Sequence, residues 1–200
     1  MKRKFEFVCQ FKVTLKGIKP AVWRRFQVPD FYTFWDLHVA IQDVFGWLDY
    51  HLHEFELMNP ESCAITAIGI PSDEELFDKK ILPGWEEGIS NWFSTKNRSA
   101  LYTYDFGDDW KHVVRLEKIS LREEKRKYPF CISGKRSCPP EDCGGVWGYQ
   151  DLLKVLKNPE HEEYEDLLNW VGGKFDPEYF DPQKVRFMDP VKRRKSAFGG

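Results

Sequence analysis

The chain contains 200 residues, of which 30 are Lys or Arg and 32 are Asp or Glu, so its formal net charge is -2. This balance excludes the strongly positive field of a protein that coats DNA, and nucleic acid is the partner that charge favours least. No stretch approaches the ~20 apolar residues that a spanning helix needs, so we expect no membrane partner. The length fits one domain that buries roughly 70% of the surface of the unfolded chain.

The cysteines and the N-terminus indicate the compartment. Five cysteines, an odd number in a chain long enough to build its own core, favour reduced thiols over a disulfide scaffold. The basic N-terminus is followed by Glu6, Gln10 and Lys12, which interrupt the apolar stretch that a signal peptide requires. We therefore expect a cytoplasmic protein.

Alternation of apolar and polar residues predicts how the chain begins. Residues 5–15 place apolar side chains on one face of a strand, and residues 22–28 form its predicted antiparallel partner. Arg24 and Arg25 are consecutive in that partner and therefore point to opposite faces. We expect one of them to enter the core region and pair with a carboxylate.

A helix and two strands are predicted next. Thr33 and Asp36 form the pattern of a capping box, and apolar residues then recur at helical spacing as far as Leu48. Strand composition follows at 52–57 and at 65–70. The acidic stretch from there to Ser99, punctuated by Gly and Pro, predicts a long irregular crossing.

The second half begins with a predicted hairpin and a long loop. Residues 101–106 and 110–116 have strand composition around a turn signal at Gly107-Asp108-Asp109. Residues 128–148 are rich in Pro, Gly and Cys and lack periodicity, so we expect a structured loop there, of the kind that carries function.

Helices complete the predicted fold. Residues 149–156 and 158–171 have helical spacing, and two Phe-Asp-Pro units, at Phe175 and Phe180, predict short helical turns. We therefore predict an α+β fold: a single-domain roll over residues 1–190, with an antiparallel sheet and about three main helices. Residues 191–200 are predicted to be a basic, disordered tail.

The predicted hairpin concentrates acidic groups. Asp105, Asp108 and Asp109 surround one turn together with His112. A two-residue loop would place Asp105 opposite His112, whereas a three-residue loop would pair Asp105 with Lys111 and Tyr104 with His112. Either register would give His112 a partner that sets its tautomer or charge. The alternative is that Asp108 and Asp109 have no role beyond forming the turn.

The long loop contains three thiols, at Cys131, Cys138 and Cys143, together with Glu141 and Asp142. Thiolates bind zinc, but this Cys-x6-Cys-x4-Cys spacing is not the tight knuckle of a structural zinc site. Small buried thiols that pack the loop are the favoured interpretation. The amides around the Gly-Gly pair that follows are an alternative anion nest.

His51 and His53 are a second candidate metal pair. Their i, i+2 spacing places both imidazoles on one face if the strand has begun there. An ordinary half-exposed strand explains the same pattern and is favoured. We therefore assign no metal and no cofactor from the sequence.

Several of these blocks together resemble the plasmid pRiA4b ORF-3-like family. They include residues 22–25, 51–55, 104–112, 138–145 and 148–149, and the resemblance runs from about Phe7 to Val185. It implies an α+β roll but very little biochemistry. Some members are labelled as transposon passengers or resolvase-like, which this sequence supports little, because it lacks a basic DNA-binding domain. Arg186 departs from the family pattern, which has Asn there.

Three functions compete. The favoured one is a module that binds a ligand or a protein partner in a cleft between the 102–112 hairpin and the 131–149 loop. The second is a metal-dependent hydrolase or nuclease, with Asp105, Asp108, Asp109 and Glu141 on the cation and His112 as acid or base. The third is a nucleic-acid-associated protein of mobile elements, using the basic tail and exposed aromatic residues.

The residues predicted to shape this cleft follow from the two blocks. Asp105, His112 and Glu141 are expected nearest its centre and are the catalytic candidates if the protein is an enzyme. The full set of predicted binding residues is Tyr104, Asp105, Asp108, Asp109, Trp110, His112, Glu141, Asp142, Trp147 and Tyr149.

Overall fold

One eight-stranded sheet organises the protein. The computed structural model describes residues 4–71 and 80–199. Its strands are β1 (Phe7–Leu15), β2 (Trp23–Pro29), β3 (His53–Met58), β4 (Ile65–Gly69), β5 (Ile81–Pro83), β6 (Ser99–Tyr104), β7 (Trp110–Leu121) and β8 (Phe130–Lys135). Its helices are α1 (Phe34–Phe45), α2 (Ile89–Trp92), α3 (Gly145–Val155), α4 (Tyr164–Trp170), the 3-10 turn η1 (Pro182–Lys184) and α5 (Pro190–Phe198).

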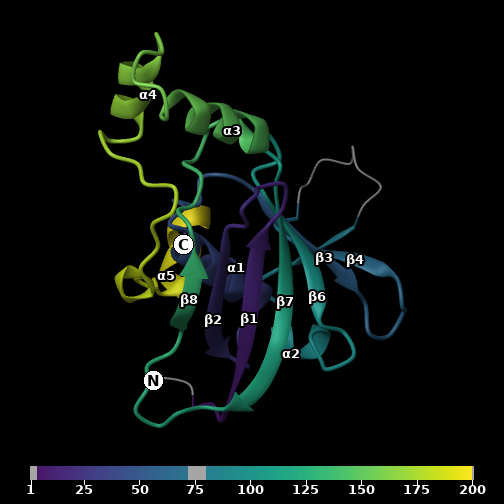
Figure 1. Cartoon of the computed structure of the whole chain (residues 1–200). Helices are drawn as coiled ribbons and strands as arrows, with labels where there is room; N and C mark the ends of the chain where they lie inside the picture. The colour runs from purple at the N-terminus through teal and green to yellow at the C-terminus, as the bar shows by residue number, and fades with distance from the viewer. Residues whose placement is uncertain (1–3, 72–79, 200) are drawn as a thin grey trace.

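The strand order is β5-β4-β3-β6-β7-β1-β2-β8, and every neighbouring pair is antiparallel except β4 and β5. The predicted opening hairpin is confirmed, since β1 pairs with β2. Helix α1 packs behind the sheet in Figure 1, while α3 and α4 extend beyond its upper end. The predicted α+β class is therefore confirmed in a single compact domain.

The core fills the space between α1 and the sheet. The predicted capping box is present: the Thr33 hydroxyl accepts from the Asp36 amide, and the Asp36 carboxylate accepts from the Thr33 amide. The helix ends at Phe45 because Gly46 adopts a left-handed conformation with φ of 85°. Leu48 therefore lies beyond the helix and is exposed. Each fully buried Phe or Leu side chain in this core contributes about 1.5–3 kcal/mol.

The predicted loop at 128–148 contains two elements that the sequence pattern hides. Strand β8 occupies its first part and adds an edge to the sheet beside β2, with a register shift between Arg25 and Phe26. Helix α3 begins at Gly145, four residues before the predicted start. Glycine and proline residues interrupt the sequence pattern across both elements. In addition, the strand is short and the helix has no side-chain cap, so neither element has a clear local signal.

The C-terminal helices also differ from expectation. Helix α4 begins at Tyr164, because residues 158–163 form turns instead of a first helical turn at Asn158. The basic tail forms α5, which Asp189 caps, instead of a disordered end. Its Phe198 ring packs 5.4 Å from those of Trp35 and Trp85, which explains why a polar helix is held there.

Within residues 4–71 and 80–199, no helix is both long enough and apolar enough to cross a membrane.

Gly145 fixes how the start of α3 meets the β6–β7 hairpin. It has a φ of 66°, and a Cβ there would lie 2.5 Å from the Asp108 carbonyl oxygen. Gly145→Ala is therefore expected to lower the free energy of unfolding by at least ~2 kcal/mol, measured by urea denaturation. Gly172→Ala is the matched control, because Gly172 has a φ of 87° but no atom within 4 Å of the added carbon. Equal losses in the two variants would refute the close approach.

Candidate functional site

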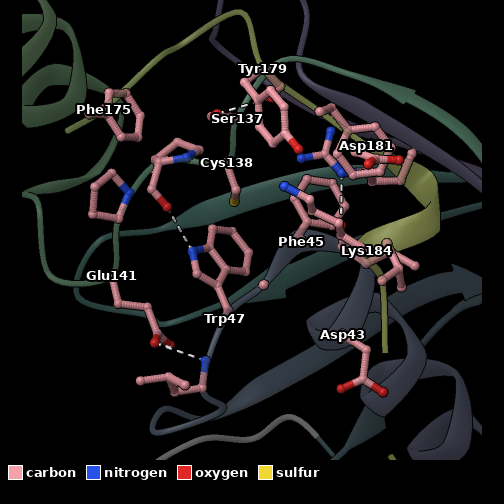
Figure 2. Close-up of a pocket in the computed structure, with 18 residues that line it drawn as sticks. Asp43, Phe45, Trp47, Ser137, Cys138, Glu141, Phe175, Tyr179, Asp181 and Lys184 are labelled. Atoms are coloured by element: carbon pink, nitrogen blue, oxygen red, sulfur yellow. Dashed lines mark hydrogen bonds between the residues drawn. The ribbon is translucent and has the colours of Figure 1, made fainter. Parts of the chain in front are cut away.

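A pocket of about 570 Å³ opens at the end of α1. Figure 2 shows its walls, which come from the turn after α1, the 137–141 loop and the 175–185 segment. The lining includes five aromatic side chains, those of Phe45, Trp47, Phe175, Tyr179 and Phe180, together with charged residues. Ligand sites in proteins are commonly concave, mostly apolar and of 300–1,000 Å³, so the size and lining are those of a small-molecule site.

Two hydrogen bonds hold the turn after α1 against the 137–141 loop. The Trp47 Nε1 donates to the Pro139 carbonyl oxygen at 3.0 Å, and the Leu48 amide donates to Glu141 Oε2 at 2.9 Å. The Trp47 ring also stacks on Phe45 and Tyr104, with centroids 5.5 and 5.1 Å apart. The wall of the pocket is thereby fixed before any ligand arrives.

Arg24 lies in the same pocket and is the most unusual residue of the fold. Its side chain is 1% exposed, and the Phe180 ring centroid lies 3.8 Å from its guanidinium carbon. Nε donates to the Val44 carbonyl, and Nη1 donates to the carbonyls of Trp23 and Lys135. Burial lowers the pKa of Arg24 to about 10, which still leaves it charged at neutral pH.

The arginine of β2 that pairs with a carboxylate is Arg25 and not Arg24. Arg25 points to the opposite face and forms two bonds with Glu117, of 2.7 and 2.8 Å. Arg24 enters the core side, but it has no carboxylate within 4 Å in the part of the chain that the structure describes. The prediction that the arginine entering the core region pairs with a carboxylate was therefore wrong.

Burial disfavours the thiolate form of the three thiols of the long loop. It raises the pKa of Cys131 to about 11 and that of Cys143 to about 12, and it also raises the pKa of Cys138. Buried thiols in such surroundings are inert nucleophiles. Neither of the two groups of three ligand-type side chains found among the described residues contains a cysteine. Cys131 belongs to the hydrophobic core, and Cys138 and Cys143 pack against that core.

Glu141 joins the pocket to the hairpin. Its Oε1 accepts a hydrogen bond of 2.5 Å from the Tyr104 hydroxyl, which in turn accepts from the Tyr50 amide at 3.1 Å. Burial is the largest cause that raises the pKa of Tyr104, and the Glu141 carboxylate adds to it. The structure thus connects the predicted hairpin and loop through Tyr104 and Glu141.

A second cluster lies on the hairpin side of Glu141. His51 Nε2 is 3.1 Å from Asp142 Oδ1 and 3.6 Å from Asp105 Oδ2. Asp105 holds its other oxygen on the amides of Gly107 and Asp108, at a φ of 56°. Sequence reasoning named all three cluster residues but did not place His51 with the two carboxylates. The three can present one nitrogen and two oxygen ligands within 4.8 Å of one another.

The hairpin register differs from both predicted alternatives. Tyr102 pairs with His112 and Tyr104 with Trp110, so five residues, 105–109, form the loop. Both predicted registers were therefore wrong. Asp105 and Asp109 adopt positive φ values of 56° and 53°, which extends the turn and moves Asp105 away from His112.

His112 lies in the core and not at the centre of a cleft. It is fully buried, and its ring meets the rings of Phe45 and Trp47 edge-on at 5.0 and 5.4 Å. Trp110, on the same strand face, is also fully buried. Neither residue lines the pocket.

The other predicted cleft residues divide between surface and core. Tyr149 is buried, whereas the Trp147 side chain is 79% exposed. Asp109 is exposed and pairs with Lys111 at 2.6 Å. Asp108 accepts from the Gly144 amide at 3.2 Å, so it links the hairpin to the start of α3.

His38, Asp49 and His53 form a buried group that sequence reasoning missed except for His53. The two imidazoles are parallel, with centroids 3.4 Å apart and an angle of 7° between their planes. A metal ion lies close to the plane of the imidazole that binds it, and two parallel planes 3.4 Å apart share no such position. In addition, both nitrogens of His38 are already hydrogen-bonded, to Tyr102 and Asp49. The arrangement of the two rings therefore does not suit one ion shared by both imidazoles.

The burial of His112 predicts how stability depends on pH. Burial lowers its pKa to about 3, although the nearby backbone of Tyr102 and Trp110 opposes the shift in part. In the unfolded chain a histidine titrates near about 6.5, so between these values the unfolded state binds one more proton and stability falls as pH drops. In His112→Leu we expect the free energy of unfolding to decline by about 1.4 kcal/mol less per pH unit between pH 6 and 4.

Urea denaturation at pH 4, 5, 6 and 8 checks this expectation. At pH 8 both states hold a neutral imidazole, so the difference between wild type and variant there reports packing alone. Parallel pH profiles for the two proteins would show that His112 does not supply the dependence.

Three comparisons place the chain among known proteins. A family model described as plasmid pRiA4b ORF-3-like protein matches residues 7–184. The uncharacterized protein y4hQ of Sinorhizobium fredii (strain NBRC 101917 / NGR234) is 35% identical over 166 residues, which is 83% of this chain and 81% of that protein. The crystal structure of the protein of unknown function MM3350 from Methanosarcina mazei Go1 has a TM-score of 0.86 and 53% identity, over 92% of this chain and all of that one. The chain thus belongs to the plasmid pRiA4b ORF-3-like family.

Proposed function

We propose that the protein is a binding module for a small organic molecule, which occupies the pocket at the end of α1. The observation that carries this proposal is a preformed cavity of about 570 Å³ with five aromatic side chains and one buried cation in its lining. The proposed site is therefore this pocket, in place of the cleft that the sequence predicted between the hairpin and the loop. The 137–141 loop supplies one wall, while the hairpin contributes only through Tyr104, which supports Glu141 from behind.

A small molecule suits this site better than a protein partner. The wall residues come from three separate segments that meet around the Trp47 and Phe45 rings. Rings of this kind contribute large contact area at a low cost in side-chain entropy. We further propose a cytoplasmic location, because none of the five cysteines forms a disulfide.

The pocket is tested by filling it. Val185 lines the cavity and is half-buried, so Val185→Trp is expected to place an indole ring in the space a ligand would use. A mixture of aromatic fragments is screened by ligand-observed NMR against wild type, and we expect hits whose signals are lost with Val185→Trp. Val191→Trp is the matched control, because Val191 is 63% exposed on α5 and does not line the pocket.

The two variants separate the outcomes. Fragments that bind wild type and both variants alike bind elsewhere, which contradicts the proposal. The absence of any hit at millimolar fragment concentration contradicts it as well.

A divalent cation at His51, Asp105 and Asp142 is a second candidate. The grouping of one imidazole and two carboxylates within 4.8 Å favours it, since such mixed ligand sets suit manganese and zinc. This site modifies the metal-dependent hydrolase hypothesis, because its ligands are His51, Asp105 and Asp142, and His112, the predicted acid or base, is not part of it. The ion pairs of His51 with the two carboxylates are the competing explanation.

Calorimetric titration with MnCl2 and with ZnCl2 tests the cation. We expect one equivalent to bind wild type and the affinity to fall about 10-fold or more in Asp142→Asn. Asp151→Asn is the control, since Asp151 is a surface residue of α3 paired with Lys154. No heat above dilution, or equal affinity in the two variants, rejects the site.

Nucleic acid remains the least favoured partner. Two of the four basic residues at 192–195 already have partners within the fold. Arg193 lies 3.8 Å from Asp43 and 3.6 Å from Asp49, and Arg194 lies over the Trp85 ring. Little of the basic helix is therefore left to form a phosphate-binding surface.

A further inference from the structure

We infer that the molecule bound in the pocket is an anion, a flat apolar body that carries a carboxylate or phosphate group, and that Arg24 binds this group. The inference rests on the proposed function, since it names the class of ligand for the same site. It starts from the charge of Arg24, which is enclosed by protein without a carboxylate partner in the described part of the chain.

The hydrogen-bond donors of Arg24 are only partly used. A guanidinium carries five N–H groups. Nε and the two hydrogens of Nη1 have the three backbone carbonyls described above as acceptors. Nη2 donates to no acceptor among residues 4–71 and 80–199, and it is not among the fully enclosed atoms that lack a partner. Since Arg24 lines the pocket, we infer that Nη2 opens toward the space that a ligand enters.

The guanidinium is held rigidly in this orientation. Its carbon lies 3.8 Å from the Phe180 ring centroid and 5.1 Å from the Phe45 ring centroid, so the guanidinium contacts two aromatic rings. The contacts with these two rings, together with the hydrogen bonds to three carbonyls, remove most of the rotamer freedom of the side chain. A preorganised donor of this kind binds an oxyanion with little further loss of entropy.

Three acidic residues line the pocket, and none of them forms an ion pair with Arg24 within 4 Å in the described part of the chain. Asp43 accepts from the Met188 amide, Glu141 accepts from Tyr104 and Leu48, and Asp181 caps Gln183. Each carboxylate is thus engaged at the edge of the cavity.

Lys184 adds a second positive charge at the rim, where its Nζ lies 5.1 Å from the Tyr179 ring centroid and Tyr179 and Asp181 are its nearest electrostatic partners. Arg24 and Lys184 can therefore face one ligand.

A buried charge without a counter-ion is costly, and an anion that completes the pair removes much of that cost. The aromatic walls favour a planar body attached to the anionic group. The competing explanation is that Arg24 only fastens backbone carbonyls together. In that case a neutral molecule of the same shape would bind equally well.

Matched pairs of probes decide between the two. Indole-3-acetate is compared with indole-3-acetamide for a carboxylate, and AMP is compared with adenosine for a phosphate, each by calorimetry on the wild-type chain. We expect the anion of at least one pair to bind about 10-fold or more tightly than its neutral partner, because charge-assisted hydrogen bonds to a desolvated guanidinium exceed neutral ones. The pair that shows the difference identifies the anionic group.

Variants then locate the effect. Arg24→Met retains the apolar stem and removes the charge, so the preference for the anion is expected to disappear. Because this variant loses three carbonyl contacts, its folding is checked by circular dichroism. Lys184→Gln does not depend on that result, since Lys184 is exposed, and it is expected to weaken only the anions by about 2- to 5-fold. Lys192→Gln, the same change of charge on α5 away from the pocket, is expected to have no effect.

The outcomes separate this inference from the proposed function. Neutral and anionic probes that bind equally, with binding lost in Val185→Trp, overturn the anion inference and leave the binding module intact. Anion binding that survives in Arg24→Met and Lys184→Gln overturns the assignment to these residues. No binding of any probe or fragment at the pocket overturns both.

Discussion

The placement of the Arg24 guanidinium is the constraint on which this end of the fold depends. Three carbonyls converge on it, from the end of α1 at Val44, from β2 itself at Trp23 and from the edge strand β8 at Lys135. The Phe180 ring from the C-terminal segment closes over it. A charge shielded from water must be satisfied by hydrogen bonds or by a partner charge. The carbonyls and the ring that contact the guanidinium therefore lie on the helix end, the edge strand and the C-terminal segment, which meet around it. The pocket is the space between these segments.

Gly134 shows how closely these segments approach. A Cβ at this position of β8 would lie 2.4 Å from the Phe180 ring and 2.8 Å from Arg24 Cδ. The strand therefore carries glycine where the stacked ring and the arginine stem need room. The same glycine made residues 128–148 look like a loop, which is why β8 was not predicted. A residue that weakens local strand propensity is here required by tertiary packing.

The parts of the fold that sequence predicted are those with a local cause. The alternation before Leu15 predicts β1, and the Thr33 and Asp36 pair begins α1, because period and capping act within a few residues. The site was predicted only in part. The shared hairpin-and-loop region includes Glu141, but its pocket wall at 175–185 is brought there by contacts with residues more than a hundred positions earlier, such as Phe180 with Arg24. No local pattern records such a contact.

His112 shows a signal that was present in the sequence. Trp110, His112 and Val114 share one parity along β7, and all three are fully buried. A histidine within a row of apolar residues on one strand face is buried with that row, even though its imidazole must then stay neutral. The chemistry of the residue suggested a site, whereas its neighbours at i-2 and i+2 indicated the core. Parity is the stronger guide when both flanking residues are large and apolar.

Glu141 has both of its carboxylate oxygens engaged by the fold. One carboxylate oxygen accepts from Leu48 on the pocket side, and the other accepts from Tyr104 on the side of the His51 cluster. Glu141 therefore links the pocket to the region of the His51 cluster. A molecule entering the pocket therefore meets a fixed acidic rim and the free donors of Arg24. Recognition by this pocket depends on the group at its base and not on the more numerous acids around its edge.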